Sequence, residues 1–127
     1  MNAAILLAAG RGSRMRESVD DKILYEVGGC TLFAKSLLAF REAAVANLWI
    51  VTYRDDSQKE LLASEASKMA PEGVEVILVK GGEERRHSVQ NALVKITPEI
   101  QIVFVHDCAR PMIRAKSLVT LLSVAIE

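Results

Sequence analysis

Four short apolar runs, separated by segments with helical periodicity, constrain the fold of this chain more than any other feature. The runs cover residues 3–7, 48–53, 74–79 and 102–106. They are apolar at consecutive positions instead of alternate ones, which is typical of strands buried on both faces of a parallel sheet. Because 127 residues make one ordinary domain, the alternation predicts a single α/β domain.

The segments between the runs have the apolar spacing of amphipathic helices. We expect helices over residues 31–46, 57–69, 84–96 and 117–126. Ser57 and Glu60 have the spacing of a capping box at the start of the second helix. We expect a three-layer fold with a mainly parallel sheet and right-handed crossovers, in which the runs are ordered third, second, first, fourth.

Composition and charge exclude several classes of protein. Sixteen Lys and Arg residues balance sixteen Asp and Glu residues, so the chain lacks the broad basic field of a nucleic-acid-binding protein. No apolar run reaches the length of a membrane span, and residues 3–9 lack the basic segment of a signal peptide. Cys30 and Cys108 have no metal-type spacing and are interpreted as reduced thiols. We therefore expect a cytoplasmic protein with no nucleic-acid or membrane partner.

The loops at one edge of the predicted sheet are the expected place for chemistry. The carboxyl ends of parallel strands share one edge, and ligands bind outside that edge. The loops that emerge there cover residues 8–22, 80–84 and 107–114. The first is long for a connection between a strand and a helix, and long loops in compact domains tend to be functional.

The first loop combines small residues with positive charge. Residues 7–16 read LAAGRGSRMR, so backbone N–H groups could approach an anion closely. Its four cationic side chains are Arg11, Arg14, Arg16 and Lys22. The GKS or GKT ending of a Walker A motif is missing, and Met15 occupies the place of the third glycine of a dinucleotide fingerprint. The loop is either a phosphate site or a solvated turn with surface cations.

The second loop, residues 80–88, reads KGGEERRHS. Two glycines directly after a strand permit a tight turn or close contact with a ligand. Arg85 and Ser88 are one helical turn apart and could face the same pocket. The structural alternative is a turn followed by a charged first turn of a helix.

The third loop begins HDCARP at residue 106. Asp107 at the end of a buried strand suits a metal or a sugar hydroxyl, whereas an ion pair with Arg110 would make it a structural brace. The side chains interpreted as structural, and not as metal ligands or nucleophiles, are His87, His106 and Cys108.

Taken together, the three loops resemble one family. LAAGRGSRM followed by a lysine is the motif of nucleotidyltransferases in general. GGEERRHSV with the NAL that follows, and VHDCARP, narrow the resemblance to 2-C-methyl-D-erythritol 4-phosphate cytidylyltransferases. The three motifs occur in the order and at the separation of that family. The resemblance extends from Ala3 to the last predicted helix.

This resemblance implies a Rossmann-like nucleotidyltransferase fold and transfer of CMP from CTP to a polyol phosphate, with Mg²⁺ on the triphosphate. It implies that Arg14 and Lys22 are catalytic, and that Asp107 lies near the metal. It implies that CTP and its acceptor are bound by Leu7, Ala8, Ala9, Gly10, Gly12, Gly82, Glu83, Arg85, Ser88, Asp107, Cys108 and Arg110.

The departures of this chain from the family include the residues around Lys22 and the length. Asp21 and Ile23 flank Lys22 where proline and glutamine are usual, and family members are nearly twice as long. We therefore expect residues 1–127 to form the N-terminal, CTP-binding part of one domain, inactive or weak alone, and a homodimer at full length. The alternatives are another acceptor, such as ribitol 5-phosphate, and a nucleotide-binding module without activity.

Overall fold

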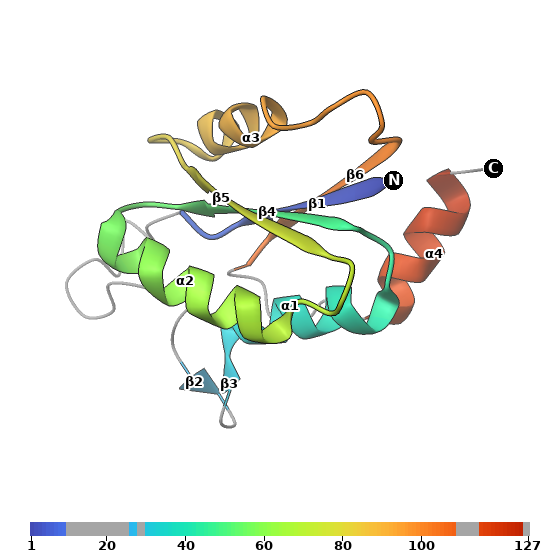
Figure 1. The fold of residues 1–127 in the computed structure, drawn as a ribbon, viewed down its shortest axis with the longest axis horizontal. Helices are drawn as coiled ribbons and strands as arrows, with labels where there is room; N and C mark the ends of the chain where they lie inside the picture. Colours follow the sequence, from blue (N-terminus) through green and yellow to red (C-terminus); the bar gives the residue numbers. More distant parts are fainter. Residues whose placement is uncertain (10–25, 28–29, 109–114, 126–127) are drawn as a thin grey trace.

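Four parallel strands form the central sheet of the molecule, shown in Figure 1 as a computed structural model that describes residues 1–9, 26–27, 30–108 and 115–125. The strands are β1 (Asn2–Leu7), β4 (Leu48–Tyr53), β5 (Glu75–Lys80) and β6 (Ile102–Asp107). Their order is β5-β4-β1-β6, which confirms the predicted order. The register pairs Leu7 of β1 with Thr52 on one side and with Asp107 on the other.

Helices cover both faces of the sheet and make the predicted three layers. The helices α1 (Leu32–Ala43), α2 (Asp56–Met69) and α4 (Ala115–Ala125) lie on one face, and α3 (Arg85–Leu93) lies on the other (Figure 1). The chain moves outward from β1 through β4 to β5 and then returns to β6 at the far side of β1. Because crossovers keep one hand, this reversal places α3 opposite the other helices.

The core is divided between the two faces of the sheet. The larger cluster lies under α1, α2 and α4, where Phe40 meets Phe104 edge to face at 6.1 Å between ring centroids. Trp49 of β4, the only tryptophan in the chain, belongs to this cluster and is completely buried. Its indole Nε1 has no hydrogen-bond partner among the described residues. The smaller cluster lies under α3 and includes Ile5, Ile50 and Ala92.

The expectation that all four strands are buried on both faces is wrong for the outer pair. From its second residue onward β1 is buried throughout, and β4 is buried except at Tyr53. In contrast, β5 and β6 are mostly half-exposed, and Val105 of β6 is 43% exposed. Each outer strand has only one neighbouring strand among the described residues, so fewer side chains cover it.

The helix ends differ from the predicted ones for local reasons. The first helix stops at Ala43 because Ala44 adopts a left-handed conformation (φ 52°), which closes the helix as a C-cap. The second begins one residue early, since Asp55 and not Ser57 is its N-cap and accepts a hydrogen bond from Gln58 N at 2.9 Å. The third ends at Leu93, before the predicted residue 96.

A short antiparallel pair that the sequence does not predict precedes α1. It consists of β2 (Glu26–Val27) and β3 (Cys30–Thr31). Thr31 is also the N-cap of α1: its Oγ1 accepts from Ala34 N at 3.0 Å and donates to Glu65 Oε2 at 2.9 Å. In the part of the chain that the structure describes, no helix is long and apolar enough to cross a membrane.

Candidate functional site

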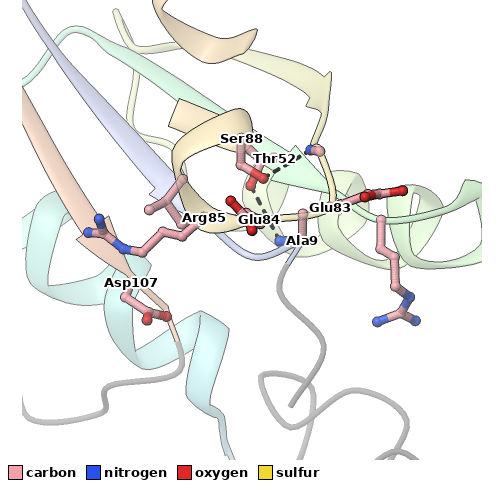
Figure 2. Close-up of a pocket in the computed structure, with 10 residues that line it drawn as sticks. Ala9, Thr52, Glu83, Glu84, Arg85, Ser88 and Asp107 are labelled. Atoms are coloured by element: carbon pink, nitrogen blue, oxygen red, sulfur yellow. Dashed lines mark hydrogen bonds between the residues drawn. The ribbon is translucent and has the colours of Figure 1, made fainter. Parts of the chain in front are cut away.

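A cavity of about 410 Å³ opens at the carboxyl edge of the sheet. It receives residues from the ends of β1, β4 and β6 and from the segment that joins β5 to α3, as Figure 2 shows. The predicted convergence of the second and third loops with the end of β1 is therefore present. The lining residues are Leu7, Ala9, Thr52, Arg54, Gly82, Glu83, Glu84, Arg85, Ser88 and Asp107.

The structure brings together most of the predicted substrate-binding residues that it describes. Those that line the cavity are Leu7, Ala9, Gly82, Glu83, Arg85, Ser88 and Asp107. Ala8 and Cys108 are buried and do not line it. The predicted residues that lie outside the described part of the chain are Gly10, Gly12, Arg14, Lys22 and Arg110.

The Gly81–Gly82 turn approaches its neighbours so closely that neither residue has room for a side chain. A Cβ on Gly81 would lie 2.4 Å from Ala9 Cβ and 2.7 Å from Ser88 Oγ, and one on Gly82 would lie 2.2 Å from His87 Cβ. Gly81 N donates to Tyr53 O at 2.8 Å, and Gly82 N donates to Ser88 Oγ at 3.1 Å. The turn is thus fixed against β4, the end of β1 and α3.

The first turn of α3 supplies a further part of the cavity lining. Its N-cap is Glu84, whose N–H donates to His87 Nδ1 at 3.4 Å and whose carboxylate pairs with Arg86 at 2.7 Å. This contact gives His87 the structural role expected from the sequence. Arg85 and Ser88, one turn apart, both line the cavity, and Arg85 extends on the side where Asp107 lies (Figure 2).

At the end of β6 a carboxylate at the cavity is followed by a buried thiol. Cys108 N donates to Leu7 O at 3.0 Å, which continues the pairing of β6 with β1. Burial, and secondarily the negative charge of Asp107, raises the pKa of the Cys108 thiol. A neutral, buried thiol is a poor nucleophile, as expected from the sequence. His106 shares a hydrogen bond with Ser36, with 3.0 Å between Nε2 and Oγ.

The sequence interpretation missed four residues at or behind the cavity: Thr52, Arg54, Gln58 and Glu84. The Thr52 hydroxyl accepts hydrogen bonds from the N–H groups of Ala8 and Ala9. These two N–H groups are therefore directed into the protein and not toward an anion, whereas residues 10–16 of the same loop lie outside the described residues. For Thr52, the signal in the sequence was its position as a polar residue inside the apolar run 48–53.

Comparisons with known proteins agree on the kind of protein. Residues 2–127 match the family profile of 2-C-methyl-D-erythritol 4-phosphate cytidylyltransferase, IspD. The chain is 37% identical over 128 residues to the enzyme of that name from Geobacillus kaustophilus, covering 98% of this chain and 53% of that protein. It is 40% identical over 123 residues to the enzyme from Shouchella clausii, covering 95% of this chain and 51% of that protein.

Solved structures show the same fold. The 4-diphosphocytidyl-2C-methyl-D-erythritol synthase of Anaerococcus prevotii has a TM-score of 0.81 at 19% identity, over 100% of this chain and 52% of that one. Rv0371c of Mycobacterium tuberculosis in complex with manganese has a TM-score of 0.68 at 21% identity, over 97% of this chain and 58% of that one.

The chain thus spans about half the length of the relatives it matches. The match nevertheless covers almost every residue of this chain and includes the segments that form the cavity. On the evidence of the family profile and of these sequence identities, the chain belongs to the 2-C-methyl-D-erythritol 4-phosphate cytidylyltransferase family.

Proposed function

We propose that this chain forms the CTP-binding part of an enzyme that transfers CMP from CTP to 2-C-methyl-D-erythritol 4-phosphate. An oxygen of the acceptor's phosphate attacks the α-phosphorus of CTP, the bond to the β-phosphate oxygen breaks, and pyrophosphate leaves. The observation that carries the proposal is the cavity at the carboxyl edge, where Gly82, Ser88 and Asp107 converge in a chain of this family. Such reactions depend on positioning and on charge stabilisation more than on covalent help from the protein.

The turn at Gly81–Gly82 and the side chain of Ser88 are the proposed pocket for cytosine. Close packing of the turn against Ala9 and His87 supports this, because a fixed backbone can discriminate by size and by hydrogen bonding. We expect purines to be too large. Uracil would reverse the donor and acceptor pattern at two positions of the ring and leave polar groups of the pocket unpaired.

Asp107 is the proposed contact with Mg²⁺. Magnesium is commonly held by one or two carboxylates together with phosphate oxygens of the substrate. The Asp107 carboxylate at the end of β6 fits this arrangement, and the described residues contain no cluster of three or more potential ligands that would form a complete protein site. The ion would neutralise negative charge on the triphosphate when bound.

Arg14 and Lys22 are the proposed catalytic residues and lie outside the described residues. In this proposal they hold the triphosphate, Gly10 and Gly12 frame it, and Arg110 lies toward the acceptor. Support comes from the family match, which includes all these positions. We extend the proposal to a cytoplasmic location and to a homodimer of the full-length form, both on the family resemblance.

Pyrophosphate release tests the proposal. The 127-residue chain and a version extended to the length of its relatives are incubated with Mg²⁺, CTP and one of two acceptors, 2-C-methyl-D-erythritol 4-phosphate or ribitol 5-phosphate. We expect turnover by the extended version with the first acceptor and CTP binding by both versions. Equal turnover with UTP would contradict the cytosine pocket, and turnover only with ribitol 5-phosphate would contradict the acceptor.

Arg14→Ala in the extended version tests the proposed catalytic role. We expect kcat to fall by roughly 10³-fold or more, because guanidinium contacts to a transferring phosphoryl group reach that size elsewhere. The KM for CTP should change much less. A higher KM at unchanged kcat would show that Arg14 binds the ground state and the transition state equally.

A further inference from the structure

Two completely buried polar side chains hold the backbone just after the end of β1: Thr52 in the cavity wall and Gln58 behind it. Thr52 Oγ1 accepts from Ala8 N at 3.1 Å and from Ala9 N at 3.3 Å. Gln58 Nε2 donates to Ala8 O at 2.9 Å, and Gln58 Oε1 accepts from Arg54 N at 2.5 Å. Neither side chain has exposed surface.

These hydrogen bonds are needed because β1 ends while its continuation is still buried. Beyond Leu7 the ladder to β4 stops, yet Ala8 and Ala9 are 1% and 6% exposed. Buried backbone N–H and C=O groups without partners cost about 1–3 kcal/mol each. Thr52 and Gln58 replace the missing ladder with side-chain partners, which explains why two polar residues lie in an otherwise apolar region.

The segment that they hold forms part of the cavity wall. Ala9 lines the cavity, and its Cβ lies where it would collide with any side chain on Gly81. A shift of Ala9 therefore changes both the wall and the position of the glycine turn. Gln58 also fixes the backbone of Arg54, a further lining residue, although Gln58 itself does not line the cavity.

We propose that Thr52 and Gln58 are positioning residues of the nucleotide site, which orient the peptide groups of Ala8 and Ala9 and thereby set the cavity wall. This inference rests on the proposed function, since it assigns CTP to the cavity. It also defines what the wall presents: with both N–H groups bound to Thr52, a ligand meets the methyl group of Ala9 and not its amide.

The test compares Thr52→Val, Thr52→Ser and Gln58→Leu in the 127-residue chain, with CTP affinity measured by calorimetry. Valine keeps the shape of threonine and removes the acceptor, whereas serine keeps the acceptor. We expect about tenfold weaker binding for Thr52→Val and Gln58→Leu, and affinity within about threefold of wild type for Thr52→Ser. Because Gln58 does not line the cavity, we expect its effect to act through the backbone groups that it holds, among them Ala8 O and Arg54 N.

Thr31→Val is the matched control. Thr31 is also a buried threonine that accepts a backbone N–H bond, but it caps α1 and does not line the cavity. We expect this variant to lower the melting temperature and to leave CTP affinity unchanged. Amide hydrogen exchange gives a readout without ligand: the N–H groups of Ala8 and Ala9 should exchange faster in Thr52→Val than in wild type or Thr31→Val.

The outcomes separate the two proposals. If the wild-type chain binds CTP, and the folded Thr52→Val and Gln58→Leu variants bind it equally well, the positioning role is overturned and the proposed function is not. A wild-type chain that binds no CTP would overturn the proposed function and this role with it. Should Thr52→Val fail to fold, Gln58→Leu decides the question. Equal loss of affinity in Thr31→Val would show a general loss of stability and also overturn the role.

Discussion

Two segments of the cavity wall are held in place by opposite means. At the end of β1, Ala8 and Ala9 are fixed by side chains that come from β4 and α2, 44 and 50 residues away from Ala8 along the chain. The Gly81–Gly82 turn is fixed by the absence of side chains, which lets its backbone lie against Ala9 and His87. The turn therefore depends on having no side chains of its own, whereas the end of β1 depends on side chains supplied by distant residues.

The largest effect should come from Gly81→Ala. Its new Cβ would meet Ala9 and Ser88 at distances that require the turn or the end of β1 to move. We expect the free energy of unfolding to fall by about 1–3 kcal/mol. CTP affinity should fall by roughly a hundredfold, because the displaced wall belongs to the cavity. Chemical denaturation and calorimetry measure the two quantities. Wild-type affinity in this variant would show that the two segments move independently.

A smaller effect is expected from Ser88→Ala, which removes the acceptor for Gly82 N and leaves the glycine packing intact. One such hydrogen bond contributes about 0.5–1.5 kcal/mol, so CTP affinity should fall by roughly threefold to tenfold. Ser123→Ala on α4 is the matched control, since its hydroxyl donates only within its own helix, to Val119 O at 3.2 Å. A Ser88→Ala variant that lowers the free energy of unfolding as much as Gly81→Ala would mean that the hydrogen bond, and not close packing, fixes the turn.

Protein stability should also depend on pH through Asp55, which lies next to the residues that hold the end of β1. Asp55, the N-cap of α2 beside Arg54 and Gln58, has its pKa lowered from 3.8 to about 2, chiefly by the N–H of Gln58 and next by the Ser57 hydroxyl. A carboxylate with a lowered pKa stabilises the fold above pH 3.8 and loses this effect as the pH falls toward 2.

Thermal unfolding between pH 5 and pH 2 checks this sign, with Asp55→Asn as the comparison because asparagine also caps helices. Wild type should melt above the variant at the upper end of this range, and the difference should shrink as the pH falls from 4 toward 2. A difference that stays constant would show that the Asp55 charge contributes nothing to stability.

The smallest effect on the site should come from Gly73→Ala, before β5. Gly73 has φ +90° and nothing lies within 4 Å of its missing Cβ, so conformational strain is its only penalty. We expect a loss of about 1 kcal/mol in the free energy of unfolding and unchanged CTP affinity. Denaturation and calorimetry measure both. Weaker CTP binding would indicate that backbone strain before β5 also disturbs the cavity. The loss of affinity in Gly81→Ala could then not be attributed to close packing alone.

Features that depend on neighbouring residues in the sequence could be predicted, whereas features that depend on residues far apart in the sequence could not. Consecutive apolar residues predict the four strands because burial inside a parallel sheet leaves a local pattern, whereas crossover handedness alone does not fix the order of the strands. Gly82 and Asp107 were found because they lie at or just after the carboxyl end of a strand, and Ser88 was found because it lies one helical turn from Arg85 at the start of α3. Thr52 and Gln58 were missed because their hydrogen-bond partners lie far along the chain. The end of the first helix was missed because Ala44 adopts a left-handed conformation, which is unusual for alanine and therefore not predicted from the sequence.

The burial of Trp49 gives the protein an intrinsic fluorescent probe of its core. Its indole lies in the core under α1, α2 and α4, and no described residue accepts a hydrogen bond from its Nε1, so its fluorescence should be blue-shifted in the native state. As the sole tryptophan it would report loss of that helical layer without labelling. Trp49 does not line the cavity, so a titration with nucleotide should leave the emission maximum in place while denaturant moves it to longer wavelength.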